Sequence, residues 1–166
     1  MADDPRILAT LPVVDDQLRV GAPNGEFWHR FNFDGYGEQK DGSQWNFGFP
    51  DNTTEQWENN VTIGRIWPIF AGERGEYELA AGDSAGARWR LAAMARAGGD
   101  GHMIPEQAWD QFPPSGQPGF LQGEATLSAS PLAWSHAQFV RLAWSIDAGR
   151  PIERPAAVAC RYAGCG

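Results

Sequence analysis

The chain has 166 residues, a length that suits one ordinary domain and is too short for a complete large barrel. Its 21 acidic and 13 basic residues give a formal net charge of −8, which disfavours binding to nucleic acid, and a hydrophobic content of 42% argues against intrinsic disorder. No stretch is long and apolar enough for a membrane span, and residues 1–6 do not begin a signal peptide.

Glycine, proline and aromatic residues are unusually frequent. There are 20 Gly, 12 Pro, 8 Trp, 9 Phe and 3 Tyr. The glycines and prolines predict long loops between the regular elements. The tryptophans fit either a core rich in large side chains or flat platforms on which sugar rings stack.

Two short extended segments are predicted near the N-terminus. Residues 17–20 form the first, which a turn at residues 21–25 closes. Residues 27–33 alternate large and polar side chains, as a half-buried strand does. Residues 34–60 are rich in Gly, Asp, Asn and Gln, which is the composition of a loop.

Helices are predicted in the middle of the chain. Residues 73–81 contain good helix formers and end at a glycine. Asp83 or Ser84 can cap a second helix over residues 85–97.

A third helix is predicted after a second long loop, which covers residues 98–129. Ser130 is a good N-cap, and Pro131 fits the first helical position of a helix that reaches about residue 146. Its apolar residues spread over a wide face, so it is expected to have neighbours on more than one side. Three helices, long loops and little strand near the N-terminus indicate an all-α chain.

The segment Gly82-Asp-Ser84-Ala-Gly86 matches the G-x-S-x-G pattern of a serine hydrolase. That chemistry needs a strand before the serine and a helix after it. The preceding residues are predicted to be helical, so Ser84 is interpreted as a helix cap. A serine hydrolase at Ser84 remains an alternative.

Metal sites are weakly indicated. The three histidines, His29, His102 and His136, are far apart, and no Cys or His spacing fits zinc. Residues 32–38 carry oxygen ligands in a glycine-rich loop, but they lack the alternating acidic pattern of a calcium loop. We therefore expect no cofactor, and a structural calcium ion at residues 32–38 stays an open alternative.

The segment from His102 to Asp110 is the strongest candidate for chemistry. Pro105 fixes its own backbone angle and biases Ile104 toward an extended conformation, so Glu106 stands on a constrained backbone. Gln107 and Asp110 follow closely. A general base needs such a rigid and supported carboxylate, although a solvated loop acid has the same pattern.

Several segments, in one order along the chain, resemble glycoside hydrolase family fifteen, which includes bacterial glucoamylases and glucodextranases. The segment R-I-W-P-I-F-A-G-E-R-G-E-Y-E-L-A-A-G at residues 65–82 looks like a hallmark of this family. The segment M-I-P-E-Q-A-W-D resembles its catalytic-base segment, and S-P-L-A-W-S-H-A is similar to the helix that follows. The resemblance covers roughly residues 4–162, including matches at residues 11–15, 31–38, 103–110 and 130–137.

The resemblance implies an (α/α)6 barrel of two concentric helix layers. It implies hydrolysis of α-glucosidic bonds at the non-reducing ends of α-glucans or oligosaccharides, which releases β-glucose with inversion. By resemblance, Glu106 is the general base and Arg65 binds the sugar. Trp67, Glu73, Arg74 and Trp109 would line or brace the sugar pocket. The α-1,4, α-1,6 and trehalose-cleaving specificities all stay open.

One departure from the family concerns the second carboxyl group. The family's general acid lies upstream of the matched segments, and neither Glu26 nor Glu38 stands in its acid motif. We therefore expect residues 1–166 to be a C-terminal portion of the catalytic domain, with a partial barrel and doubtful activity alone. A non-catalytic carbohydrate-binding remnant is the alternative from another class.

Overall fold

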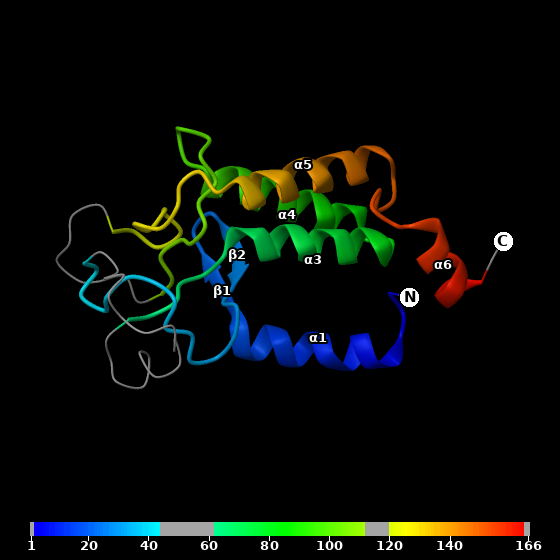
Figure 1. Cartoon of the computed structure of the whole chain (residues 1–166), viewed down its shortest axis with the longest axis horizontal. Coiled ribbons are helices and arrows are strands. Elements are labelled where there is room, and N and C mark those ends of the chain that lie inside the picture. Colours follow the sequence, from blue (N-terminus) through cyan, green and yellow to red (C-terminus); the bar gives the residue numbers. More distant parts are fainter. Residues whose placement is uncertain (1, 44–61, 112–119, 165–166) are drawn as a thin grey trace.

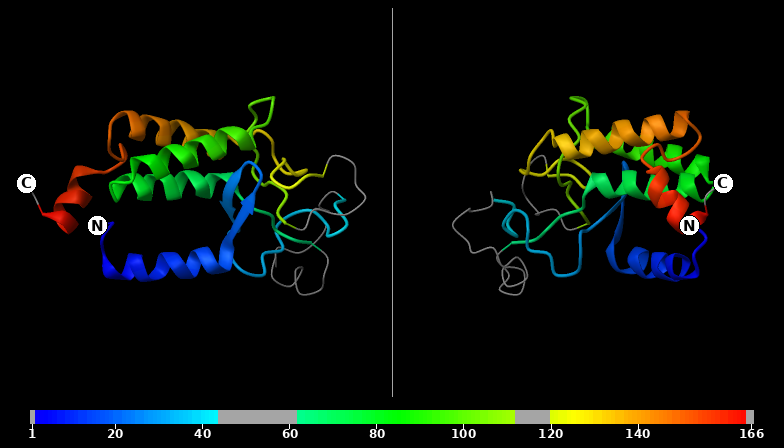
Figure 2. Two further views of the ribbon diagram at one scale, coloured as in Figure 1. Left: turned by 180° about the vertical axis from the view of Figure 1, so that it is seen from behind. Right: turned by 45° about the vertical axis from the view of Figure 1, so that its right-hand side comes forward.

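The computed structural model describes residues 2–43, 62–111 and 120–164, and over these residues the chain is mostly helical (Figure 1). Three helices pack against one another, and the first helix runs along one side of this group and leads into a two-stranded hairpin at its end (Figure 2). In chain order the elements are α1 (Pro5–Leu18), β1 (Arg19–Ala22), β2 (Gly25–Trp28), α3 (Pro68–Ala80), α4 (Ser84–Ala97), α5 (Ala133–Asp147) and α6 (Ala156–Ala163).

Glycines on α3 allow the three packed helices to approach closely. A Cβ atom added at Gly72 would lie 2.5 Å from Cγ of Gln138 on α5, and one added at Gly75 would lie 2.7 Å from Cδ2 of Leu142. These distances are shorter than any van der Waals contact, so larger residues at these positions would separate α3 from α5. Helix α4 closes the same core with Met94, which is fully buried.

The predicted position of helix α4 is confirmed, whereas α3 and α5 begin at other residues than those predicted. Asp83 is the N-cap of α4 and accepts a hydrogen bond from the backbone N–H of Gly86 at 2.8 Å. Helix α3 starts five residues early, at Pro68, because proline suits the first helical turn. Helix α5 starts at Ala133, since the hydroxyl of Ser130 donates to the carbonyl of Met103 at 3.3 Å and caps nothing.

Helix α1 was not predicted, and here the sequence interpretation was wrong. Asp4 caps the helix by accepting a hydrogen bond from the N–H of Arg6 at 2.9 Å, and Pro5 occupies the first turn. Pro12 lies inside the helix, where a proline normally ends one, and so obscures the pattern. Only the end of the predicted segment 17–20 is a strand.

The hairpin is antiparallel and pairs Arg19 with Trp28 and Ala22 with Gly25. Its second strand is shorter than the predicted segment 27–33 and ends at Trp28. Isolated bridges then join Trp28 to Trp67 and Ile66 to Ala108. These pairings gather the loops before α3 and after α4 at one end of the molecule (Figure 1).

The C-terminal helix α6 was also not predicted. It contains Cys160, which is disulfide-bonded, whereas Cys165 lies outside the described residues. Among the described residues, none of the helices combines the length and the apolar character needed to cross a membrane.

Candidate active site

Glu106 lies in the loop between α4 and α5, and the start of α5 holds its segment in place. The backbone N–H of Ile104 donates to Nε2 of His136 at 3.0 Å. The hydroxyl of Ser135 donates to the carbonyl of Pro105 at 3.1 Å, in a buried position. These two bonds hold the two residues that precede the candidate base, so the rigid backbone that Pro105 predicts is present and is tied to a helix.

Gln107, the neighbour of Glu106, connects three segments. Its side-chain oxygen accepts a hydrogen bond from the N–H of Arg65 at 2.6 Å, and its side-chain amide donates to the carbonyl of Tyr36 at 2.8 Å. Its backbone N–H donates to the hydroxyl of Ser128 at 3.0 Å. Because Gln107 is buried, these bonds fix the loop of Tyr36 beside Glu106.

The side chain of Glu106 is half-buried among polar groups. It shares a hydrogen bond with the hydroxyl of Tyr36. Arg30 lies 4.5 Å from the centre of the Tyr36 ring and binds Asp34 with two hydrogen bonds, at 2.7 and 2.8 Å. Burial raises the pKa of Glu106 above its ordinary value; the charge of Arg30 opposes this rise and the charge of Glu38 adds to it.

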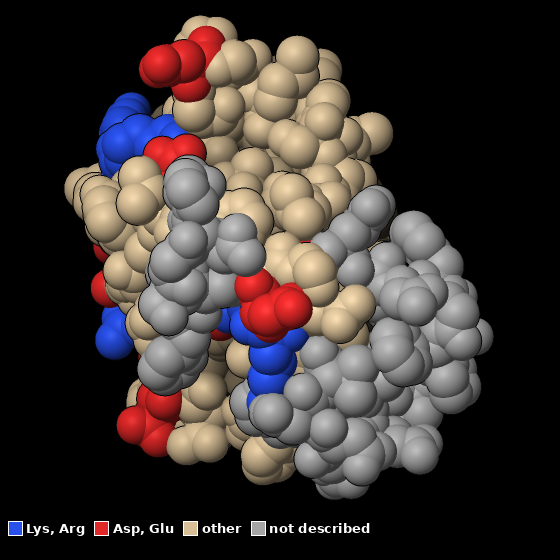
Figure 3. Space-filling model, turned by 90° about the vertical axis from the view of Figure 1, so that its left-hand side faces the viewer, with Lys and Arg blue, Asp and Glu red and all other residues tan. Residues whose placement is uncertain are grey.

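Aromatic rings stand next to this group. Trp67 is buried, and its ring centre lies 6.2 Å from Tyr36, 6.2 Å from Phe70 and 6.4 Å from Trp134. Arg30 lies 5.2 Å from the centre of the Trp67 ring. Figure 3 looks onto this loop end, where acidic and basic side chains adjoin near the middle of the face.

Arg65 and Trp109 lie beneath this surface. The guanidinium of Arg65 pairs with Asp110 at 3.0 Å, and each side chain is only 1% exposed. The same guanidinium lies 4.9 Å from the centre of the Trp109 ring, which packs against Phe120 at 4.5 Å. These residues brace the loops that carry Glu106.

Glu73 and Arg74 lie elsewhere, on α3. Both line a cavity of about 300 Å³ between α1 and α3, and Arg30 lines it as well. Arg74 donates to Asp15 of α1 at 2.9 Å and stacks over the ring of Trp28 at 4.8 Å. The structure therefore brings Glu106 and Trp67 together with Arg30, and it places Glu73 and Arg74 on the α1 side.

The weaker sequence candidates have structural explanations. The carboxylate of Asp34, in the possible calcium loop, accepts hydrogen bonds from Arg30 and from the N–H of Tyr36 at 2.9 Å. Across the described ranges, no three His, Cys, Asp or Glu side chains gather as metal ligands. Ser84 is the first residue of α4 and follows helix α3, so the strand–turn–helix context of a hydrolase serine is not met.

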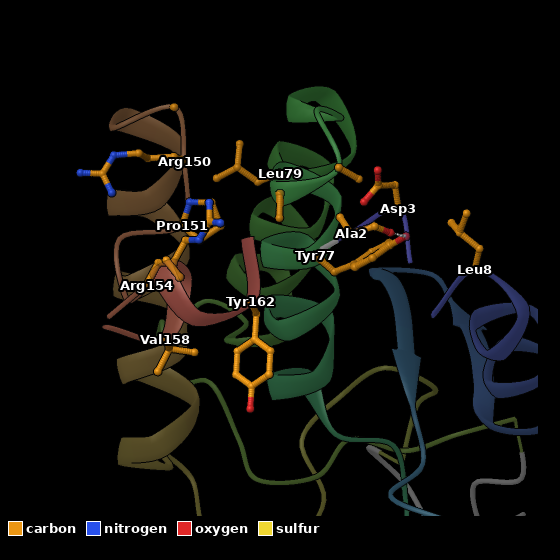
Figure 4. A pocket seen from close by; sticks show the side chains of 14 residues that line it. Ala2, Asp3, Leu8, Tyr77, Leu79, Arg150, Pro151, Arg154, Val158 and Tyr162 are labelled. Atoms are coloured by element: carbon orange, nitrogen blue, oxygen red, sulfur yellow. Dashed lines mark hydrogen bonds between the residues drawn. The ribbon is translucent and has the colours of Figure 1, made fainter. Parts of the chain in front are cut away.

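Another cavity, of about 820 Å³, lies at the opposite end of the helices. It is formed by the start of α1, the end of α3 and helix α6, with Leu79, Val158 and Tyr162 among its lining residues (Figure 4). No residue that the sequence predicts for the site lines it.

Sequence reasoning missed Arg30 and Tyr36 as neighbours of Glu106. Their segment was noted as a loop and as a stretch that resembles the family, without a role for either side chain. An arginine four residues before an aspartate, with a tyrosine two residues later, is the only local signal. The pairing with Glu106 depends on the fold.

Comparisons with known proteins show which family the chain resembles. The sequence pattern described as Glycosyl hydrolases family 15 matches residues 1–144. A glucoamylase of Clostridium sp. (strain G0005) is 39% identical over 160 residues, which are 96% of this chain and 19% of that protein.

Two solved structures are similar. A bacterial glucoamylase complexed with acarbose matches 97% of this chain and 20% of its own, with a TM-score of 0.78 and 37% identity. A structure described as a glycosidase matches 91% of this chain and 33% of its own, with a TM-score of 0.55; at 23% identity it supports the fold alone. The chain thus spans about a fifth of each glucoamylase that it resembles. Because the family pattern matches most of its residues, the chain belongs to glycosyl hydrolase family 15.

Proposed function

We propose that the chain takes part in hydrolysis of α-glucosidic bonds, with Glu106 as the general base. The observation that carries this proposal is the state of Glu106: a half-buried carboxylate on a rigid segment, with a raised pKa, in a chain of family 15. A raised pKa makes a carboxylate a better proton acceptor. Tyr36 and Arg30 supply the hydrogen bond and the positive charge that orient it.

The reaction proposed is an inverting one. Glu106 removes a proton from a water molecule while a second carboxyl group protonates the leaving oxygen, with about 6.5–9.5 Å between the two groups. The water attacks from the face opposite the broken bond and gives β-glucose. By resemblance to the family, the acid belongs to a segment upstream of those matched. This chain would then supply the base half of the site.

The proposed architecture follows from the same resemblance. Residues 1–166 would form a C-terminal portion of an (α/α)6 catalytic domain, in which further helices complete both layers. The 0.78 TM-score to part of a bacterial glucoamylase supports this arrangement. That relative was solved with acarbose, which supports an α-glucan or oligosaccharide as the substrate.

Different roles are proposed for the other site residues. Trp67 and Arg30 would form the wall of the sugar pocket beside Glu106. The resemblance assigns sugar binding to Arg65, and its burial adds a bracing role that it shares with Trp109. Glu73 and Arg74 would shape the pocket from the α1 side.

A chimera tests the proposed function. The chain replaces the corresponding 19% of the Clostridium glucoamylase, which retains its own upstream segments. We expect the chimera to release β-glucose from maltose, detected by NMR before the anomers equilibrate. Glu106→Gln keeps the shape of the side chain but removes the base, and it should lower kcat by at least about 100-fold.

The control for this experiment is Glu124→Gln, which removes an exposed carboxylate from the loop that follows. It should leave kcat unchanged. Full activity of the Glu106→Gln chimera would remove the base assignment. A chimera that binds acarbose and yields no glucose, although folded, would favour the carbohydrate-binding remnant.

A further inference from the structure

Glu38 is a buried carboxylate with no assigned role. Its side chain is only 2% exposed, although acidic residues are rarely buried without a partner. Both carboxylate oxygens lack a hydrogen-bond partner within the described parts of the chain. Burying such a group costs free energy, so its retention needs an explanation beyond packing.

The backbone holds Glu38 firmly next to the candidate site. The carbonyl of Glu38 accepts a hydrogen bond from the N–H of Ile63 at 3.1 Å, and Gln39 forms a bridge with Thr62. At Gly37 a Cβ atom would collide with the carbonyl oxygen of Ile63, so the two segments touch directly. The backbone of Glu38 is therefore fixed against the segment of residues 62–64.

The same loop also contacts Glu106. Tyr36, two residues before Glu38, shares a hydrogen bond with the Glu106 carboxylate, and the amide of Gln107 holds the Tyr36 carbonyl at 2.8 Å. Among the described residues, the charged and titratable groups that act on Glu106 are Arg30, Glu38 and Tyr36. Glu38 is the only carboxyl group of the three.

We propose that Glu38 is a positioning residue for Glu106: a buried second carboxyl group that strengthens the candidate base as a proton acceptor. Its catalytic meaning rests on the function proposed above. Two carboxyl groups in one site disfavour ionisation of both, so each makes the other hold a proton more tightly. Consistent with this, the charge of Glu38 helps to raise the pKa of Glu106, to which burial contributes most.

The coupling also has a consequence for proton binding that packing alone lacks. If the charge of Glu38 acts on Glu106, removing that charge while keeping the shape of the side chain must lower the pKa of Glu106. A purely structural role for Glu38 predicts no such change when the shape is kept.

The test is a carbon-13 NMR titration of the glutamate side chains in the full 166-residue chain. It compares the unmodified chain with Glu38→Gln, and Glu106→Gln identifies the signal of Glu106. We expect Glu38→Gln to move the titration midpoint of Glu106 to lower pH. Glu124→Gln, at an exposed site, should leave the Glu106 midpoint unchanged.

Backbone spectra of each variant verify folding. If Glu38→Gln does not fold, Glu38→Leu replaces it, because it also removes the charge and places no polar group in the buried position, and the same shift of the Glu106 midpoint is expected. A Glu106 midpoint that stays within the change caused by Glu124→Gln would overturn the proposal. Since the titration needs no turnover, an inactive chimera would contradict the proposed function and leave this coupling intact.

Discussion

At the scale of single residues, the pair Arg65–Asp110 is the strongest electrostatic feature beneath the site. Each side chain is 1% exposed, and the two charges lie 3.0 Å apart. Removing one partner of a buried pair takes away a hydrogen-bonded counter-charge from a site shielded from water, which costs about 3–5 kcal/mol. Asp110→Asn should therefore lower the free energy of unfolding by about that amount, measured by urea denaturation.

Asp100→Asn is the matched control for this prediction, because Asp100 is exposed in the turn after α4. It should change the unfolding free energy by no more than about 0.5 kcal/mol. An Asp110→Asn variant as stable as this control would show that the buried pair contributes little to folding.

Features that depend on neighbouring residues in the sequence were predicted well, whereas contacts between residues far apart in the sequence were not. Pro105 and the polar residues around it indicated a rigid carboxylate at Glu106, and the structure confirms the constrained segment. The hydrogen bond between Tyr36 and Glu106 joins residues far apart in the sequence. No local pattern encodes such a contact, because it depends on segments that the fold brings together, such as those of Tyr36 and Arg65, which both hydrogen-bond to Gln107.

At the scale of elements, the turn between α3 and α4 followed its local signals, whereas the starts of α3 and α5 and the whole of helix α1 were not predicted. Asp83 marked the start of α4 correctly, and Gly82 follows the end of α3 as expected. The interior Pro12 concealed α1, whose own N-cap at Asp4 is regular. None of its residues is buried, so its apolar pattern was a weak guide as well.

Asp15 connects α1 to the rest of the molecule. It accepts hydrogen bonds from Arg74 of α3 at 2.9 Å and from the indole N–H of Trp28 at 3.0 Å. Partial burial opposes ionisation, but these bonds prevail and hold the pKa of Asp15 below its ordinary value. Asp15→Asn should therefore speed amide hydrogen exchange in α1 and leave exchange in α4 unchanged.

The stabilisation that Asp15 gives to α1 is expected to weaken at acidic pH. The folded chain holds Asp15 ionised more strongly than the unfolded chain does, so the stabilisation is present above the unfolded pKa, about 3.9. It is lost as the pH falls through the lower folded value. Protection of α1 should thus drop toward acidic pH in the unmodified chain but not in Asp15→Asn, once intrinsic exchange rates are subtracted. Equal drops in both would exclude Asp15 as the cause.

At the scale of the whole molecule, α5 has polar residues inside and apolar residues outside. Three of its four buried residues are polar: Ser135, Gln138 and Ser145. Its exposed side chains include Val140, at 59%, and Trp144, at 64%. These two positions are four residues apart and share one face. In the toroid proposed above, neighbouring helices would cover such a face.

In the isolated chain, this face should promote self-association, because exposed large apolar groups on one helix surface favour contact with another copy. Sedimentation velocity should show an average mass that rises above 18.2 kDa with increasing concentration. The double variant Val140→Gln, Trp144→Gln should remain near the monomer mass, with unfolding close to that of the unmodified chain since both side chains are exposed. Leu121→Gln, at another exposed apolar residue, should associate as the unmodified chain does. If the double variant also associates equally, another surface drives self-association, and the α5 face is not its cause.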